Sequence, residues 1–155
     1  MRSALDVAKY FLCRIDRDAG DTISPLKLQK LVYYAQAWSL VLRDKPLFSE
    51  KIQAWSHGPV VYEVWNTYKE HRHTAIPAPD ADDLCALDFI DDELEVLEEV
   101  WNVYGELSAR QLEHLTHTES PWLDARKGVD PGERSQEVIS HEKMKSYYEK
   151  YVVED

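Results

Sequence analysis

Cysteine is scarce in this chain, because only Cys13 and Cys85 occur among its 155 residues. Two cysteines without paired spacing provide neither a disulfide framework nor a zinc site, and they are typical of a reducing cytoplasm. Long apolar runs are also missing. No stretch approaches the roughly 20 apolar residues of a membrane span, and charges interrupt the start of the chain, where a signal peptide would lie. We therefore expect a soluble cytoplasmic protein with no membrane partner, forming a single domain over residues 1–155.

Basic residues are missing from one segment of the chain. Residues 80–106 contain 11 Asp and Glu and no Lys or Arg, so this segment alone matches the net charge of −11. Lys and Arg drive binding to nucleic acids, because they displace counterions from phosphates. The composition therefore argues against a nucleic-acid partner, with a DNA-binding autoregulator kept as a minor alternative, and it favours a basic protein partner.

The most apolar stretch predicts a helix over about 24–43 at the centre of the fold. Ser24 is a suitable N-cap and Pro25 a suitable first helical residue. At about 100° of rotation per residue, apolar side chains cover nearly the whole circumference of this helix. Lys30 is expected to extend its ammonium group to solvent. A narrow polar strip remains, either an exposed ridge or a buried hydrogen-bonded seam, and it consists of Gln29, Gln36, Ser39 and Arg43.

Apolar periodicity and capping residues predict further helices around the central one. We expect them near 3–19, 61–70, 91–104, 108–117, 120–127 and 140–151. A short extended element is expected near 48–56, followed by a turn at His57-Gly58-Pro59 that leads straight into the next helix. Residues of about 72–90, rich in Pro and Asp, are expected to form a flexible acidic linker. The predicted fold class is therefore all-α, with one compact multi-helix domain.

Three sequence blocks stand out, in the order Leu-Lys-Leu-Gln-Lys-Leu-Val-Tyr-Tyr-Ala-Gln-Ala (26–37), Ala-Trp-Ser-His-Gly-Pro-Val-Val-Tyr-Glu-Val-Trp-Asn-Thr-Tyr-Lys (54–69) and Leu-Thr-His-Thr-Glu-Ser-Pro-Trp-Leu-Asp-Ala-Arg (115–126). Together they resemble the Panacea antitoxin family, which includes SocA-type antitoxins and GepA-like proteins of phages and genomic islands. The resemblance implies a helical domain that neutralises a toxin encoded beside it, usually by direct protein contact. It also implies that SocA-type members can act as adaptors that present a toxin to a Clp protease.

The motif residues of these blocks are assigned to building the fold. They are Leu28, Lys30, Leu31, Tyr33, Tyr34, Gly58, Pro59, Val60, Tyr68, His117, Pro121 and Trp122.

Partner contacts are predicted on the polar strip of the central helix, beside the His57 turn and on the acidic segment. Glu95 and Glu99 are like charges one helical turn apart with no lysine to offset them, which costs an isolated helix about a few tenths of a kcal/mol. A basic toxin surface would relieve that repulsion and be steered towards it. For Trp55 and His57, a role in building the fold is the favoured interpretation. The predicted contact residues are Gln29, Gln36, Arg43, Trp55, His57, Asp92, Glu95 and Glu99.

The histidines raise one enzymatic alternative. His114 and His117 lie three residues apart on one helical face, close to Glu119, and this spacing occurs in metal sites. His71 and His73 add two further imidazoles. The chain lacks a His-Glu-x-x-His motif, so a metal-dependent hydrolase is the alternative, and the main interpretation is a non-enzymatic protein without metal or cofactor.

Overall fold

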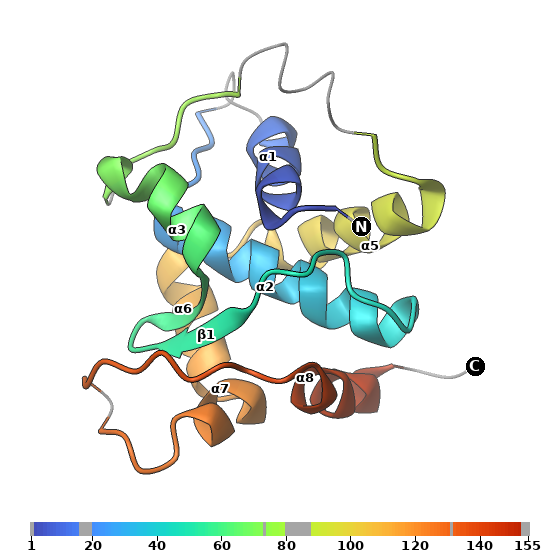
Figure 1. Ribbon diagram of the computed structural model, residues 1–155. Helices are drawn as coiled ribbons and strands as arrows, with labels where there is room; N and C mark the ends of the chain where they lie inside the picture. The colour runs from blue at the N-terminus through green and yellow to red at the C-terminus, as the bar shows by residue number, and fades with distance from the viewer. Residues whose placement is uncertain (1, 16–19, 73, 80–87, 131, 153–155) are drawn as a thin grey trace.

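The computed structural model describes residues 2–15, 20–72, 74–79, 88–130 and 132–152. His73, Cys85 and residues 80–87 of the expected linker lie outside these ranges. The described part contains seven α-helices, two short 3-10 helices and one hairpin, which confirms the prediction of a mainly helical fold (Figure 1). No described helix is long and apolar enough to cross a lipid bilayer. The elements are α1 (Ala4–Arg14), α2 (Pro25–Leu42), β1 (Ile52–Trp55), β2 (Gly58–Val61), α3 (Tyr62–Tyr68), η1 (Lys69–His71), α5 (Asp91–Tyr104), α6 (Ala109–His117), α7 (Ser120–Ala125), α8 (His141–Tyr148) and η2 (Glu149–Tyr151).

Helix α2 runs through the middle of the molecule (Figure 1) and contacts α1, α3, α5, α6, α8 and β2. The predicted start signals are present, because Ser24 accepts a hydrogen bond from the backbone N–H of Lys27 and Pro25 is the first helical residue. Twelve of the 18 residues of α2 are buried, whereas a surface helix buries a single stripe. The expectation of a central buried helix is therefore confirmed.

Three further helices, α1, α6 and α8, also begin at a serine N-cap. Ser3, Ser108 and Ser140 each accept a hydrogen bond from the backbone N–H three residues further on. Helix α5 covers the predicted residues, with Gly105 as its C-cap. Helix α1 ends at Arg14, whereas the sequence predicted a helix to about residue 19. Local capping chemistry therefore sets most of the helix starts in this chain.

The hairpin corrects one expectation. The sequence predicted one extended element, with Pro59 starting a helix, but Gly58–Val61 forms a second strand that pairs with β1 in antiparallel fashion, and α3 begins only after it. A long-range contact explains the difference. The side-chain amide of Gln29 donates to the carbonyl of Val61 at 3.2 Å and accepts from the N–H of Val61 at 3.0 Å, as a neighbouring strand would.

Proline is tolerated in β2 because the residue opposite it finds partners elsewhere. Pro59 faces Ala54 and has no N–H to donate. The carbonyl of Ala54 instead accepts from Nη1 of the buried Arg126 at 2.9 Å, and the N–H of Ala54 donates to the carbonyl of Glu137 at 2.8 Å. The hairpin is therefore completed by residues far along the chain.

Lys30 is fully buried, which corrects the expectation that it reaches solvent. Its Nζ donates to the carbonyl of Pro59 at 3.2 Å. A Cβ atom added at Gly58 would lie 2.5 Å from Cε of Lys30 and 3.0 Å from Oγ1 of Thr116. Burial lowers the pKa of Lys30 to about 7, and the charge of Glu113 acts in the opposite direction. The start of β2 is therefore built directly over a buried lysine.

Gly58→Ala should destabilise the fold by about 3 kcal/mol, because the new Cβ meets Lys30 and because L-residues rarely adopt a strongly positive φ. The φ angle of Gly58 is +113°. Gly20→Ala is the matched control, since Gly20 also has a positive φ, +87°, but has open space around it. The control should cost about 1 kcal/mol. Urea unfolding followed by circular dichroism measures both losses, and equal losses would contradict the crowding at Gly58.

Lys30→Met should remove a pH dependence of stability. In the folded protein Lys30 loses its proton near pH 7, whereas in the unfolded chain it keeps the proton up to the ordinary pKa of 10.5. The unfolded state therefore binds more protons between these values, so the free energy of unfolding should rise with pH, by up to about 1.4 kcal/mol per pH unit. Below about pH 7 the lysine is charged in both states and adds no slope.

Urea unfolding from about pH 6 to pH 9 tests this assignment. The native protein should gain stability across the upper part of this range, and Lys30→Met should gain less. Parallel curves for the two proteins would show that Lys30 titrates as an exposed lysine does.

Candidate partner-binding groove

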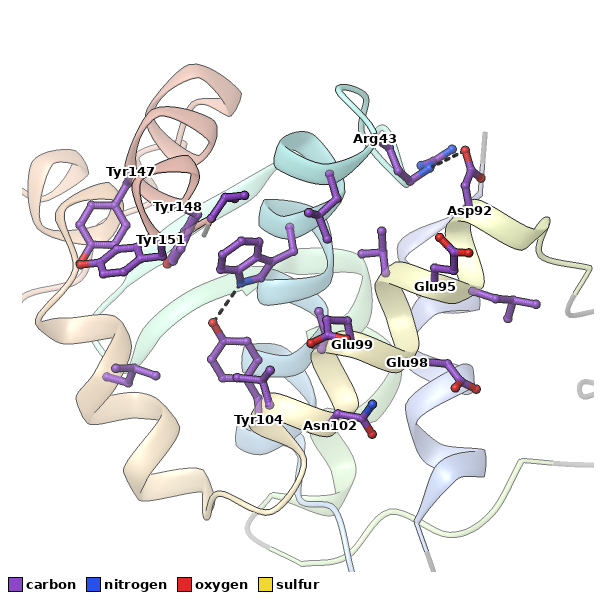
Figure 2. Close-up of a pocket in the computed structure, with 18 of the residues that line it drawn as sticks. Arg43, Asp92, Glu95, Glu98, Glu99, Asn102, Tyr104, Tyr147, Tyr148 and Tyr151 are labelled. Carbon is purple, nitrogen blue, oxygen red and sulfur yellow. Dashed lines mark hydrogen bonds and ion pairs between the residues drawn. The ribbon is translucent and has the colours of Figure 1, made fainter. Parts of the chain in front are cut away.

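A groove with a volume of about 1420 Å³ lies between α2, α5 and α8 (Figure 2). The C-terminal half of α2 forms its floor, α5 forms one side, and α8 with η2 forms the other. Across the floor, Nε1 of Trp38 donates to the hydroxyl of Tyr104 at 3.0 Å, which ties α2 to the end of α5. The α5 side of the groove carries carboxylates, and the side formed by α8 and η2 carries tyrosine rings.

The α5 side of the groove is acidic. The apolar face of α5 packs on the core together with the buried Glu93, whereas Asp92, Glu95 and Glu99 are exposed and line the groove. Figure 2 shows Glu95 and Glu99 along the same helix. Among the residues that the structure describes, neither of these two forms an ion pair. The repulsion predicted between them is therefore uncompensated within the described fold.

Arg43 closes one end of the groove and is held inside the molecule. Its side chain is 7% exposed, with Nε 3.3 Å from Oδ2 of Asp92 and Nη2 4.0 Å from Oε2 of Glu93. Its Nη1 donates to Oγ of Ser39 at 3.0 Å. Asp92 thus has a cationic partner within the fold, which distinguishes it from the other two predicted acids of this surface.

The polar strip of α2 is a buried seam and not an exposed ridge. Gln36 is fully buried, where its Nε2 donates to the carbonyl of Phe48 at 2.8 Å and its Oε1 accepts from the N–H of Leu47 at 2.8 Å. Gln29 is buried against the backbone of Val61 in the same way. Contrary to expectation, the structure does not offer Gln29 and Gln36 to a partner, because both amides are already paired in the interior.

The base of the groove is a network of tyrosines around one carboxylate. Oε1 of Glu119 accepts hydrogen bonds from the hydroxyls of Tyr34 and Tyr148, both at 2.7 Å, and the hydroxyls of Tyr148 and Tyr33 lie 2.9 Å apart. Tyr34 stacks on Tyr104 with 4.0 Å between the ring centroids. Burial raises the pKa of Glu119, and the two tyrosine hydroxyls oppose that rise. This network joins α2, α8 and the segment between α6 and α7.

Large apolar side chains are exposed along the groove. Leu42 is 51% exposed, Val103 is 55% exposed and Tyr151 is 60% exposed, and all three line it. Exposed apolar side chains gathered in one place are typical of binding surfaces. These three residues were not predicted. Val103 carried a signal, since it continues the stripe of Glu95 and Glu99 at a spacing of four residues and is apolar on an otherwise polar face.

Trp55 and His57 lie on the hairpin and do not line the groove. The ring of Trp55 packs edge-on against Trp65, with 5.4 Å between the ring centroids, and its carbonyl accepts from Nε1 of Trp122 at 2.8 Å. Nδ1 of the exposed His57 lies 3.1 Å from Oε1 of Glu113 on α6. The predicted contact residues thus divide between the hairpin and the groove.

The motif residues lie mostly in the interior, where they build the frame of the molecule. Tyr68 and His117 are half-buried. The buried ones are Leu28, Lys30, Leu31, Tyr33, Tyr34, Gly58, Pro59, Val60, Pro121 and Trp122.

The three residues of the enzymatic alternative are not brought together as metal ligands. The ring of His117 stacks on Trp122 with 4.0 Å between the ring centroids, while the carboxylate of Glu119 accepts from two tyrosines. His114 is exposed on α6. Within the described ranges, no group of three or more His, Cys, Asp or Glu side chains is placed to hold a metal ion.

Comparison with known proteins places these features in a family. The model of the family "Antitoxin SocA-like, Panacea domain" matches residues 28–123, which include most of α2, the hairpin and α5. Antitoxin SocA of Caulobacter vibrioides (strain NA1000 / CB15N) is 33% identical in an alignment of 109 residues, which covers 64% of this chain and 58% of that protein. The chain therefore spans less than two thirds of the length of this relative. No solved structure matches the chain. Because the family model covers more than half of the sequence, as the three motifs predicted, the chain belongs to the Antitoxin SocA-like, Panacea domain family.

Proposed function

We propose that this chain is a non-enzymatic antitoxin that neutralises a cognate toxin by binding it in the groove between α2, α5 and α8. Family membership and the likeness to antitoxin SocA support the antitoxin role. One observation supports the groove as the binding site. The groove brings Glu95 and Glu99, which have no ion-pair partner among the described residues, together with the exposed side chains of Leu42 and Val103.

The two kinds of side chain in the groove have separate effects on binding. Complete removal of a Leu or Val side chain from water contributes about 1.5–3 kcal/mol, so covering Leu42 and Val103 stabilises a complex. Exposed carboxylates act mainly on the association rate of a basic partner and less on affinity. A toxin surface with apolar residues beside Lys or Arg satisfies both demands.

Binding suits the groove better than catalysis does. The buried carboxylate of Glu119 accepts from Tyr34 and Tyr148, so it is engaged in holding the base of the groove together. The ring of His117 is packed against Trp122. A catalytic acid, base or metal ligand must be able to reach the substrate. The metal-dependent hydrolase that uses His114, His117 and Glu119 is therefore the weaker candidate.

The adaptor role towards a Clp protease, which the family resemblance implies, requires a second surface. The hairpin provides one outside the groove, with Trp55 packed on Trp65 and with His57 exposed. In this proposal Trp55 and His57 contact the protease while the toxin occupies the groove. An adaptor needs two partners bound at once, and separate surfaces allow this.

Leu42→Glu should abolish neutralisation when the chain is expressed together with the toxic product of the adjacent gene. The substitution places a charge at the apolar edge of the groove, where its burial under a partner is costly. Leu123→Glu is the matched control, because Leu123 is also exposed, at 44% against 51%, and does not line the groove. Growth of the co-expressing cells is the readout. Survival of cells that carry Leu42→Glu would contradict the proposal. So would the death of cells that express the native chain, whichever of the adjacent gene products they express with it.

The amount of toxin in the same surviving cells separates the two mechanisms. Capture in the groove leaves the toxin level unchanged. Delivery to a protease lowers it, and Trp55→Ala together with His57→Ala should then restore it.

Glu95→Gln with Glu99→Gln should slow association with the toxin about three- to tenfold at low salt and flatten the salt dependence of that rate. Asp92 is left unchanged, because its ion pair with Arg43 is part of the fold. Glu63→Gln with Glu70→Gln is the control, since it changes the net charge equally on exposed residues outside the groove. Stopped-flow or surface-binding kinetics measure the rates. Equal rates for the two double variants would show that only net charge matters.

A further inference from the structure

The walls of the groove are helical, and this limits what can lie in it. The backbone N–H and C=O groups within α2, α5 and α8 are paired inside each helix, so the groove offers an occupant side chains but no strand edge. The hairpin, which is the one sheet of the described ranges, does not line the groove. A segment that buries its backbone here has to pair its own N–H and C=O groups, and an α-helix does so.

Charge is distributed unevenly across the groove. Glu95 and Glu99 lie along α5, and the tyrosine rings of α8 and η2 lie across the floor from them (Figure 2). Among the described lining residues the one cationic side chain is Arg43, which is already in an ion pair with Asp92. An occupant therefore needs Lys or Arg on the edge that faces α5 and apolar side chains on the rest of its buried face. A second copy of this chain is a poor occupant, because its net charge of −11 opposes the approach.

The spacing of the acids matches that of a helix. Glu95 and Glu99 are one turn apart, which is about 6 Å along the helix axis. A second helix packed along α5 meets them both when it carries Lys or Arg at positions i and i+4. Val103 continues the same stripe one turn further and is exposed. A partner helix along α5 therefore needs basic side chains opposite Glu95 and Glu99 and an apolar side chain opposite Val103.

We infer that the groove receives an amphipathic helix of the toxin, with its apolar stripe against Leu42, Val103 and Tyr151 and its basic residues against Glu95 and Glu99. This inference rests on the proposed function and adds the class of segment that is recognised. The family match ends at residue 123, so the tyrosine side of the groove, on α8 and η2, lies beyond it. That side selects among basic helices by the shape of their apolar stripe.

Three synthetic peptides of about 18 residues, long enough to form a helix on binding, test the inference against the full chain. The first carries a Leu stripe at helical spacing, with Lys at i and i+4 along one edge. The second has the same composition in an order without a stripe, and the third replaces each Lys of the first by Glu. Calorimetry at low salt gives the Kd of each peptide, and amide hydrogen exchange shows whether the bound peptide is helical.

The first peptide should bind about tenfold or more tightly than the other two, and its own amides should become protected. Glu95→Gln with Glu99→Gln should weaken its binding severalfold and Leu42→Glu should abolish it, whereas Leu123→Glu and the Glu63→Gln, Glu70→Gln pair should leave it unchanged. Binding of the scrambled peptide with equal affinity, unprotected peptide amides, or binding that survives Leu42→Glu would overturn the inference.

The outcomes also separate this inference from the proposed function. If the helical peptide fails while Leu42→Glu still abolishes neutralisation of the toxin in cells, the groove binds the toxin through a segment of another kind, and the inference alone is overturned. If the native chain neutralises no adjacent gene product, the antitoxin proposal itself is overturned.

Discussion

The fold depends on one constraint, which is that every polar group on the buried helix α2 must find a partner in the interior. An unpaired polar group there costs about 1–3 kcal/mol, so a helix with several of them is stable only in a matching surround. Gln29 pairs with the hairpin, Lys30 with the start of β2, Gln36 with the chain after α2, and Tyr34 with Glu119 near α7. These hydrogen bonds reach three different segments, because Gln29 and Lys30 both pair with β2, and they fix where each segment packs.

The same constraint produces the groove. The C-terminal end of α2 is not covered by the other elements, because Trp38 is half-buried and Leu42 is largely exposed between α5 and α8. The apolar face of α5 packs against the core, which leaves Glu95 and Glu99 on the surface beside this part of α2. Arg43 neutralises the acids at one end, and Glu95 and Glu99 are left without an ion-pair partner among the described residues. The groove is thus the surface that remains when the apolar and polar groups of the core have found their partners.

Local signals predicted the elements of this chain well, and long-range partners decided what they missed. Serine caps, such as Ser24 and Ser108, act within four residues, so the sequence alone reveals them. The strand at Gly58–Val61 depends on Gln29, and the burial of Lys30 depends on the carbonyl of Pro59, which lies 29 residues away. No periodicity or cap records such a pairing. The acidic side of the groove was predicted because charge is visible in composition, but its apolar side joins residues from three separate helices.

The motif residues and the groove residues occupy different parts of the molecule. The motif side chains are mostly interior, so replacing them alters stability before it alters binding. The groove residues Leu42, Val103 and Tyr151 are exposed and contribute little to the core, which means that they can change at small cost to the fold. The family match covers the frame and the acidic side but not α8. Under the proposed function, the carboxylates that attract a basic partner therefore lie within the matched residues, together with Leu42 and Val103, whereas the tyrosine side of the groove lies outside them.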